Sequence, residues 1–147
     1  MSGEEKGFTY LALLFAIVLV GISLSAVGQY WSTILKRERE AELLFRGDQI
    51  KDAIGAYYRA HKRYPDRLEH LLRDPYELGT KRYLRRIYPD PMTRDGQWVL
   101  IVDRFQRVRG VRSKSEEKPL KRGRFPKEYR HFAIAETYSD WEFVYNP

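Results

Sequence analysis

The sequence predicts an α+β fold, in which one long N-terminal helix packs against a small antiparallel β-sheet. Residues 8–35 carry no charge, and an apolar periodicity typical of an amphipathic helix continues to residue 63. Short apolar runs separated by turn residues follow, as is typical of antiparallel strands. We therefore expect four parts: a charged leader (1–7), a membrane-spanning helix segment (8–35), its amphipathic continuation (36–63) and a C-terminal α+β domain (64–147).

The apolar segment is long enough to cross a bilayer. As a helix rising about 1.5 Å per residue, residues 8–27 match the ~30 Å thickness of the hydrocarbon core. A cleaved secretory signal, cut near residues 23–25, is a second interpretation. Such a signal needs a basic start and an apolar stretch of about 7–15 residues. Here Glu4 and Glu5 outnumber Lys6, and the apolar stretch is longer, which favours a membrane-spanning helix.

A plain membrane anchor is another interpretation, and the flanking charges bear on its orientation. Lys36, Arg37 and Arg39 follow the apolar segment, whereas Lys6 alone precedes it. Basic residues are enriched on the cytoplasmic side of membrane helices. For a plain anchor, this rule places the C-terminal domain in the cytoplasm.

The amphipathic continuation is predicted from a single apolar stripe, and no proline interrupts residues 36–63. Intervals of seven, four and three residues separate the members of the stripe, which places them on one helical face. They are Leu43, Ile50, Ile54 and Tyr57, and Tyr58 and Ala53 are predicted to belong to the same face. Pro65 disfavours helical dihedrals in the residue before it. Gly47 and Gly55 either permit close contact with the sheet or mark soft points, and the mixed charges of residues 36–40 predict a solvated surface.

The C-terminal domain is predicted to begin with a short helix after Pro65 and to end with strands. The strand candidates are residues 98–102, 107–112 and 141–145. The first two are expected to pair in antiparallel fashion. Residues 113–129 are rich in lysine and arginine and contain Pro119, Gly123 and Pro126, which predicts an irregular loop.

Composition limits the chemistry that we expect. The chain contains no cysteine, which excludes disulfides, zinc–thiolate sites and thiol catalysis. His61, His70 and His131 lie in different segments without the spacing of metal ligands. No phosphate-binding glycine loop, dinucleotide fingerprint or nucleophile elbow is present. We therefore expect a protein that is not an enzyme and that has no metal and no cofactor.

The chain is basic, with a net charge of +7. All but one of its 27 Lys and Arg residues and all but two of its 20 Asp and Glu residues lie from residue 36 onward. Such a balance favours phospholipid heads, nucleic acid or acidic proteins as partners. Two clusters next to aromatic residues form a candidate anionic-partner patch: Arg82, Arg85 and Arg86, and Lys121, Arg122 and Arg124. DNA binding by cations and stacked rings is one interpretation, and solvated faces or docking of an acidic neighbour are the others.

The start of the chain resembles a known processing site. Residues 6–14, KGFTYLALL, are similar to the site at which type IV prepilins and type II secretion pseudopilins are cut. Residues 55–58, 64–72, 88–93 and 138–141 also resemble parts of these proteins, so the similarity covers most of the chain. It implies that a prepilin peptidase cuts between Gly7 and Phe8 and then N-methylates Phe8.

The resemblance also implies a fold, a function and partners. The fold would be a type IV pilin-like roll. The protein would be a single-pass subunit of the bacterial inner membrane, with its N-terminus cytoplasmic and its C-terminal domain periplasmic, assembled into a pseudopilus for type II protein secretion. Its partners would be the prepilin peptidase, other pseudopilins or pilins in a homo- or hetero-polymer, and the inner-membrane assembly platform with its ATPase. A minor type IV pilin with a DNA-uptake or adhesion role, or a membrane-anchored adaptor, are the alternatives.

One position departs from the family pattern. At the fifth residue after the cut the family usually has glutamate, whereas this chain has Ala12. In the family the glutamate is thought to pair with the free amino terminus of a neighbouring subunit, because a carboxylate in lipid needs a cation. With Ala12 beside Leu13 and Leu14, assembly would rest on apolar packing, as in a minor, tip or divergent subunit.

Overall fold

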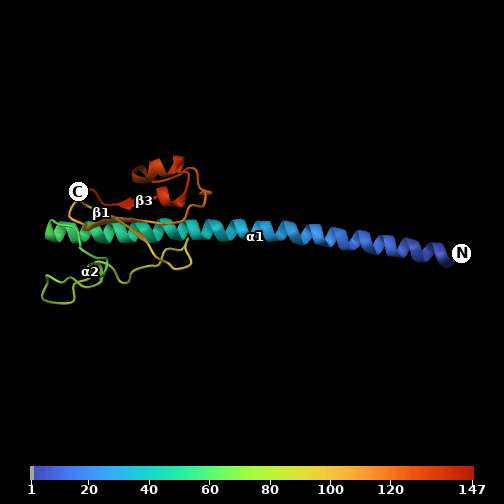
Figure 1. The fold of residues 1–147 in the computed structure, drawn as a ribbon, viewed down its shortest axis with the longest axis horizontal. Helices are drawn as coiled ribbons and strands as arrows, with labels where there is room; N and C mark the ends of the chain where they lie inside the picture. The colour runs from blue at the N-terminus through green and yellow to red at the C-terminus, as the bar shows by residue number, and fades with distance from the viewer. Residues whose placement is uncertain (1) are drawn as a thin grey trace. The chain divides into compact units, whose positions relative to one another are not determined.

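The computed structural model describes residues 2–147, and their side chains from residue 6 onward. It contains an N-terminal unit that ends at Lys36 and a C-terminal unit, Arg37–Pro147, which we describe separately. Helix α1, Ser2–His61, contributes to both units. The C-terminal unit adds a three-stranded antiparallel sheet to its own part of α1 (Figure 1). The predicted α+β class is therefore confirmed.

The N-terminal unit is helical throughout its described residues. Two serine hydroxyl groups in its apolar part find acceptors within the helix. Ser23 Oγ donates to the carbonyl oxygen of Leu19 at 2.8 Å, and Ser25 Oγ donates to that of Gly21 at 3.0 Å. These bonds satisfy the hydroxyls without water, so the serines are compatible with an apolar environment.

In the C-terminal unit, α1 forms one wall of the core. Of the predicted stripe, Leu43, Ile50, Ile54 and Tyr57 are 0 % exposed and Ala53 is 3 % exposed, whereas Tyr58 is only partly buried. The helix ends at His61, two residues before the expected end at residue 63. Lys62 adopts a left-handed conformation with φ 55°, and its N–H donates to the carbonyl oxygen of Tyr58 at 2.7 Å. This closing turn, which precedes Pro65, ends the helix.

The sheet has the order β1-β2-β3, and its strands lie within the three predicted runs. Strand β1 is Val99–Val102, β2 is Val108–Arg112 and β3 is Glu142–Val144. Leu100 pairs with Val111, and Val111 pairs with Phe143, so the three side chains form a row on one face. Val111 and Phe143 are fully buried, whereas Leu100 on the edge strand is 44 % exposed.

Two glycines allow α1 and the β3 region to approach closely. A Cβ atom at Gly47 would lie 2.4 Å from the ring of Phe143, and one at Gly55 would lie 2.7 Å from the ring of Tyr145. These positions therefore permit close contact, which was the first of the two interpretations. The ring of Phe132 packs edge-on against Phe143, with 5.5 Å between ring centroids, and this aromatic packing extends the core beyond the sheet.

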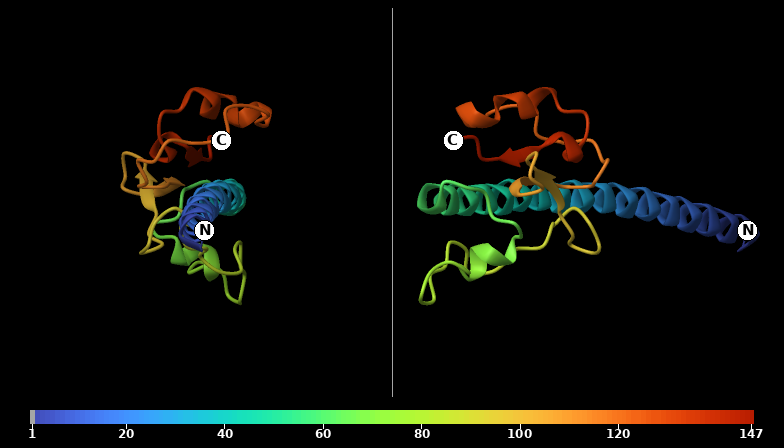
Figure 2. Two further views of the ribbon diagram at one scale, coloured as in Figure 1. Left: turned by 90° about the vertical axis from the view of Figure 1, so that its right-hand side faces the viewer. Right: turned by 60° about the vertical axis from the view of Figure 1, so that its left-hand side comes forward.

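Short helices and irregular segments form the rest of the C-terminal unit. Helix α2 is Glu69–Leu72, and the 3-10 helices η1 and η2 are Lys127–Ile134 and Tyr138–Asp140. Residues 113–126 contain no helix or strand, as predicted, but η1 begins inside the loop that was expected to reach residue 129. Helix α2 and the segment after it lie on one side of α1, and η1 lies on the other (Figures 1 and 2).

Candidate assembly segment and anion-binding patches

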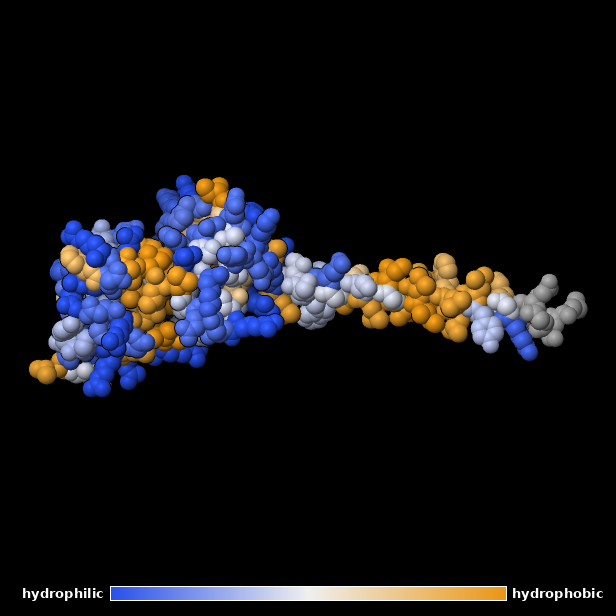
Figure 3. Space-filling model, viewed as in Figure 1, coloured by the Kyte–Doolittle hydropathy of each residue, from blue (hydrophilic) through white to orange (hydrophobic). Residues whose placement is uncertain are grey.

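The N-terminal unit presents its apolar side chains on the outside. The large apolar residues from Phe8 to Val27 are each between 53 % and 74 % exposed. Figure 3 shows them as a nearly continuous apolar surface on the visible face. The helix, taken from Lys6 onward, is long and apolar enough to cross a membrane. Exposed apolar surface of this extent marks a contact with lipid or with another protein.

The predicted processing and assembly residues all lie in this part of α1. Gly7 and Phe8 are adjacent in the helix, and a Cβ atom at Gly7 would meet nothing within 4 Å. Ala12, Leu13 and Leu14 are exposed. Cleavage, methylation and intersubunit packing at these residues stay predictions.

The structure separates the two basic clusters that the sequence predicted. One lies on the segment after α2, and the other lies on the segment between β2 and η1, on opposite sides of α1 (Figure 2). The first consists of Arg82, Arg85 and Arg86, and the second of Lys121, Arg122 and Arg124. They therefore form two patches and not one continuous surface.

Two members of the second cluster contribute contacts to the fold. The Lys121 ammonium lies 4.8 Å from the centre of the Phe125 ring. Arg122 Nη1 donates a hydrogen bond of 2.6 Å to the carbonyl oxygen of Ala135. These contacts hold the segment between β2 and η1 in place, so we interpret the second cluster as largely structural.

The first cluster borders a hollow of about 330 Å³. Arg82 and Arg85 line it together with Arg73, which follows α2. The Arg86 guanidinium instead lies 5.0 Å from the centre of the Tyr88 ring. Sequence reasoning missed Arg73 because only the folding of the chain after α2 brings it beside Arg82 and Arg85.

Glu40 is a buried carboxylate in the run that was predicted to be solvated, so that prediction is wrong at this position. It is 4 % exposed. Its Oε1 accepts hydrogen bonds from the backbone N–H groups of Leu120 at 2.8 Å and Lys121 at 2.9 Å, and from the Tyr138 hydroxyl at 3.2 Å. Burial, together with the Glu40 charge, raises the pKa of Tyr138. Glu40 thereby fastens the segment between β2 and η1 to α1.

Asp74 is a second buried carboxylate and is 2 % exposed. It accepts hydrogen bonds from the Tyr83 hydroxyl at 2.8 Å and from the backbone N–H of Tyr76 at 3.0 Å, and it lies 2.5 Å from His61 Nε2. Burial opposes its negative charge, but the donors outweigh burial and hold the pKa of Asp74 below its usual range. This network connects the end of α1 to the segment after α2.

Lys51 belongs to α1, and its side chain is buried against η1. Its ammonium lies 2.7 Å from a carboxylate oxygen of Glu128 and 3.0 Å from one of Asp48, and it faces the ring of Tyr129 at 4.6 Å. Burial opposes its positive charge, but these partners hold the pKa of Lys51 above its usual range. Lys51 thus holds η1 against α1.

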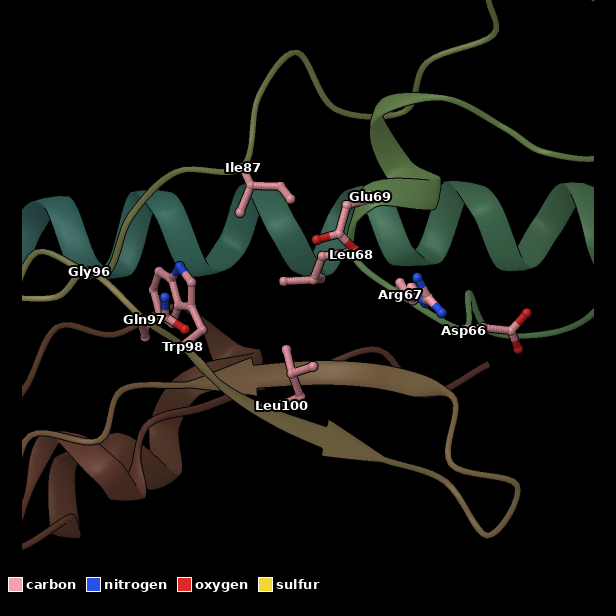
Figure 4. Close-up of a pocket in the computed structure, with 9 residues that line it drawn as sticks. All are labelled: Asp66, Arg67, Leu68, Glu69, Ile87, Gly96, Gln97, Trp98 and Leu100. Carbon is pink, nitrogen blue, oxygen red and sulfur yellow. The ribbon is translucent and has the colours of Figure 1, made fainter.

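A hollow of about 350 Å³ lies between the region of α2 and strand β1 (Figure 4). Its apolar lining is provided by Leu68, Ile87, Trp98 and Leu100. The Trp98 indole N–H donates to the carbonyl oxygen of Tyr88 at 2.7 Å, which fixes the ring at the edge of the hollow. The lining is suited to apolar contacts and holds none of the predicted site residues.

The three histidines lie apart in the fold. His61 contacts Asp74 at the end of α1, whereas His70 lies in α2 and His131 lies in η1. Across the described part of the chain, no group of three histidine or acidic side chains could hold a metal ion.

Comparison with known proteins gives no match: no family model, curated protein or solved structure matches the chain. The pilin-like identity is therefore a prediction from the processing-site motif, and function is argued from the residues of the chain itself.

Proposed function

We propose that the protein is a pseudopilin-like structural subunit that is inserted in the bacterial inner membrane and assembled into a periplasmic pseudopilus for type II protein secretion. The observation that carries this proposal is the exposure of every large apolar side chain from Phe8 to Val27, on a helix that continues into the core of an α+β unit. Burial of one such side chain is worth about 1.5–3 kcal/mol. The segment therefore requires lipid or neighbouring helices.

The same surface suits both surroundings. In the membrane, lipid tails cover residues 8–27, and in a fibre the equivalent helices of neighbouring copies cover them. Because lipid tails and packed aliphatic side chains are similarly apolar, the hydrophobic effect gives little preference for either. The work of extraction would come from the partner ATPase.

Ala12 affects how neighbouring copies would align. A carboxylate at this position would attract the amino terminus of the next subunit within the membrane. With alanine, the axial stagger depends on the packing of exposed side chains such as Leu13 and Leu14. This property suits a minor, tip or divergent subunit.

The intact mass of the membrane-extracted protein tests the processing step. Expression with a prepilin peptidase should remove residues 1–7 and add one methyl group to the new terminus at Phe8. Gly7→Val should block the cut, whereas Gly3→Ala, a glycine substitution within the same leader, should leave it unchanged. An unprocessed wild-type chain, or a cut near Ser25, would contradict the proposal.

Cross-linking tests the assembly step, and the absence of native cysteines makes single-cysteine variants unambiguous. Leu14→Cys, treated with a bis-maleimide that links two thiols, should form covalent dimers when the assembly machinery is present, because each chain carries one thiol. The same variant in the Gly7→Val background should form none, because an uncut leader would prevent entry into the fibre. Equal yields of dimer in the two backgrounds would refute ordered assembly.

A membrane-anchored adaptor that faces the cytoplasm is the second candidate. It is favoured by Lys36, Arg37 and Arg39, which directly follow the apolar segment. A reporter that is active only in the periplasm, fused after Pro147, distinguishes the two candidate functions. Activity supports the pseudopilin-like subunit, and an inactive but stable fusion supports the adaptor.

A further inference from the structure

The hollow beside α2 brings three arginines together. Arg73, Arg82 and Arg85 line it, with the side chains of Leu72 and Thr80. The Leu71 carbonyl oxygen accepts hydrogen bonds from the backbone N–H groups of Tyr83 and Leu84, each at 2.9 Å. These bonds place the segment that carries Arg82 and Arg85 next to the end of α2, which Arg73 follows. The bonds thus fix the backbone positions from which the three arginines extend.

Leu71 and Leu84 also anchor this region in the core, since they are 0 % and 6 % exposed. Arg82 and Arg85 flank Leu84 in the sequence, so burial of the leucine holds the segment that presents both of them. The three arginines themselves are exposed. They can therefore reach a ligand that arrives from solvent.

The carboxylates of the same loop are already engaged. Asp74 is held by His61 and the Tyr83 hydroxyl, and Glu77 forms an ion pair of 2.8 Å with Lys81. Within the described part of the chain, neither Arg73, Arg82 nor Arg85 forms an ion pair with a carboxylate. The three arginines that line the hollow are thus not neutralised by an ion pair with a described carboxylate.

We propose that this arginine hollow binds the phosphate group of a small anionic ligand. A phosphate monoester carries about −1.5 to −2 charges at pH 7 and presents three acceptor oxygens, whereas a carboxylate carries one charge and two oxygens. Guanidinium groups bind phosphate through paired N–H donors. The Thr80 hydroxyl is a further donor beside the hollow, and Leu72 provides an apolar contact for the rest of the ligand.

The position of the hollow argues against two larger sources of phosphate. The second basic cluster lies on the other side of α1, so it does not extend the hollow into a track for duplex DNA (Figure 2). Within the C-terminal unit, Asp74 contacts His61 at the end of α1, and its neighbour Arg73 lines the hollow, so the hollow lies near the end of α1. His61 is ~36 Å along α1 from Arg37, at about 1.5 Å per residue. A lipid head group next to Arg37 would therefore not reach it.

Calorimetric titration of the full-length chain in a non-ionic detergent, at constant ionic strength, tests the site with inorganic phosphate as the probe. We expect saturable binding of one phosphate per chain. Arg82→Gln/Arg85→Gln should weaken it by about tenfold or more, because it removes two of the three guanidinium groups that can form charge-assisted hydrogen bonds with phosphate. Arg94→Gln/Arg104→Gln, which removes the same charge from exposed arginines elsewhere, should leave the affinity unchanged.

A conservative variant separates geometry from charge. Arg85→Lys keeps the positive charge but removes the planar fork, so phosphate affinity should fall several-fold. Three results would overturn the proposal: no saturable phosphate binding, equal weakening in the two double variants, or an unchanged affinity in Arg85→Lys. Competition with a short DNA duplex and with phosphatidylglycerol vesicles identifies the source. If DNA or vesicles bind at the hollow and phosphate does not displace them, the proposal is also overturned.

Discussion

Gly47→Ala tests the closest contact between α1 and β3. A Cβ atom at this position would lie 2.4–2.5 Å from three atoms of the Phe143 ring. The ring cannot move away easily, because Phe143 is 0 % exposed and packs against Tyr129 and Phe132 at 5.6 and 5.5 Å between centroids. Overpacking costs about 1–3 kcal/mol, and a clash with three ring atoms at once places this substitution in the upper part of that range, at about 2–3 kcal/mol. The higher helix propensity of alanine returns ~1 kcal/mol, so we expect a net destabilisation of about 1–2 kcal/mol.

Urea unfolding of the full-length chain in mild detergent, followed by near-ultraviolet circular dichroism, measures this effect. With a urea slope of about 2 kcal/mol per molar, the middle of the usual range, the midpoint should fall by roughly 0.5–1 M while the slope is unchanged. Gly123→Ala is the matched control, because its Cβ atom would meet nothing within 4 Å. It should change stability by less than about 0.5 kcal/mol. The loss of stability in Gly55→Ala should lie between those of Gly47→Ala and Gly123→Ala, because its Cβ atom would contact the ring of the partly exposed Tyr145.

A second substitution identifies the contact itself. In Gly47→Ala/Phe143→Leu the smaller side chain makes room for the new methyl group. The double variant should therefore be more stable than the sum of the two single losses implies. A Gly47→Ala protein as stable as the wild type, or strictly additive losses, would show that the helix and the ring do not touch as described.

Three further predictions use the same urea assay. Because the pKa of Asp74 is lowered in the folded chain, its contribution to the free energy of unfolding is present above the ordinary pKa of about 3.9 and is lost as the pH falls through the lowered value. Asp74→Asn should therefore flatten the fall in unfolding free energy between pH 5 and about pH 2. Burial raises the pKa of Tyr57 to about 12, and its hydroxyl has no hydrogen-bond partner among the described residues. Tyr57→Phe should therefore keep full stability at pH 7, and it should lose less stability than the wild type as the pH rises from 10 to 12. Tyr138→Phe removes one of three donors to Glu40 and should cost about 1–2 kcal/mol, and an unchanged midpoint would contradict the described contact.

Local periodicity explains why much of the fold was predictable. The spacing of Leu43, Ile50, Ile54 and Tyr57 identifies the buried face of α1 without any knowledge of its partner. Strands β1 and β3 lie within runs rich in apolar residues, β2 lies within an alternation of basic and small apolar residues, and turn residues limit their lengths. The sequence could not show that Lys62 closes α1, because a left-handed conformation at lysine has no local signature.

Contacts between distant segments explain what the sequence missed. Glu40 lies in a run of alternating charges that is typical of a solvated helix, and its backbone donors are 80 and 81 residues away. Likewise, the cluster of Arg82, Arg85 and Arg86 was visible as neighbours in the sequence, but the hollow includes Arg73 and leaves Arg86 against an aromatic ring. Residue type predicted the charge of the patch, and only the fold determined which members converge.

The fold also divides the charges of the C-terminal unit unequally between core and surface. Among the described residues, the buried charged side chains are three acids, Glu40, Asp74 and Asp90, and one base, Lys51. The acids accept hydrogen bonds that hold irregular segments in place. Asp90, for example, accepts a hydrogen bond of 2.7 Å from the Ser113 hydroxyl. Because more negative than positive charge is enclosed, the surface is more basic than the net charge of +7 indicates. Copies placed side by side in a fibre would therefore repel one another unless anions or acidic partners lie between them, and a phosphate bound by the arginine hollow would reduce that repulsion.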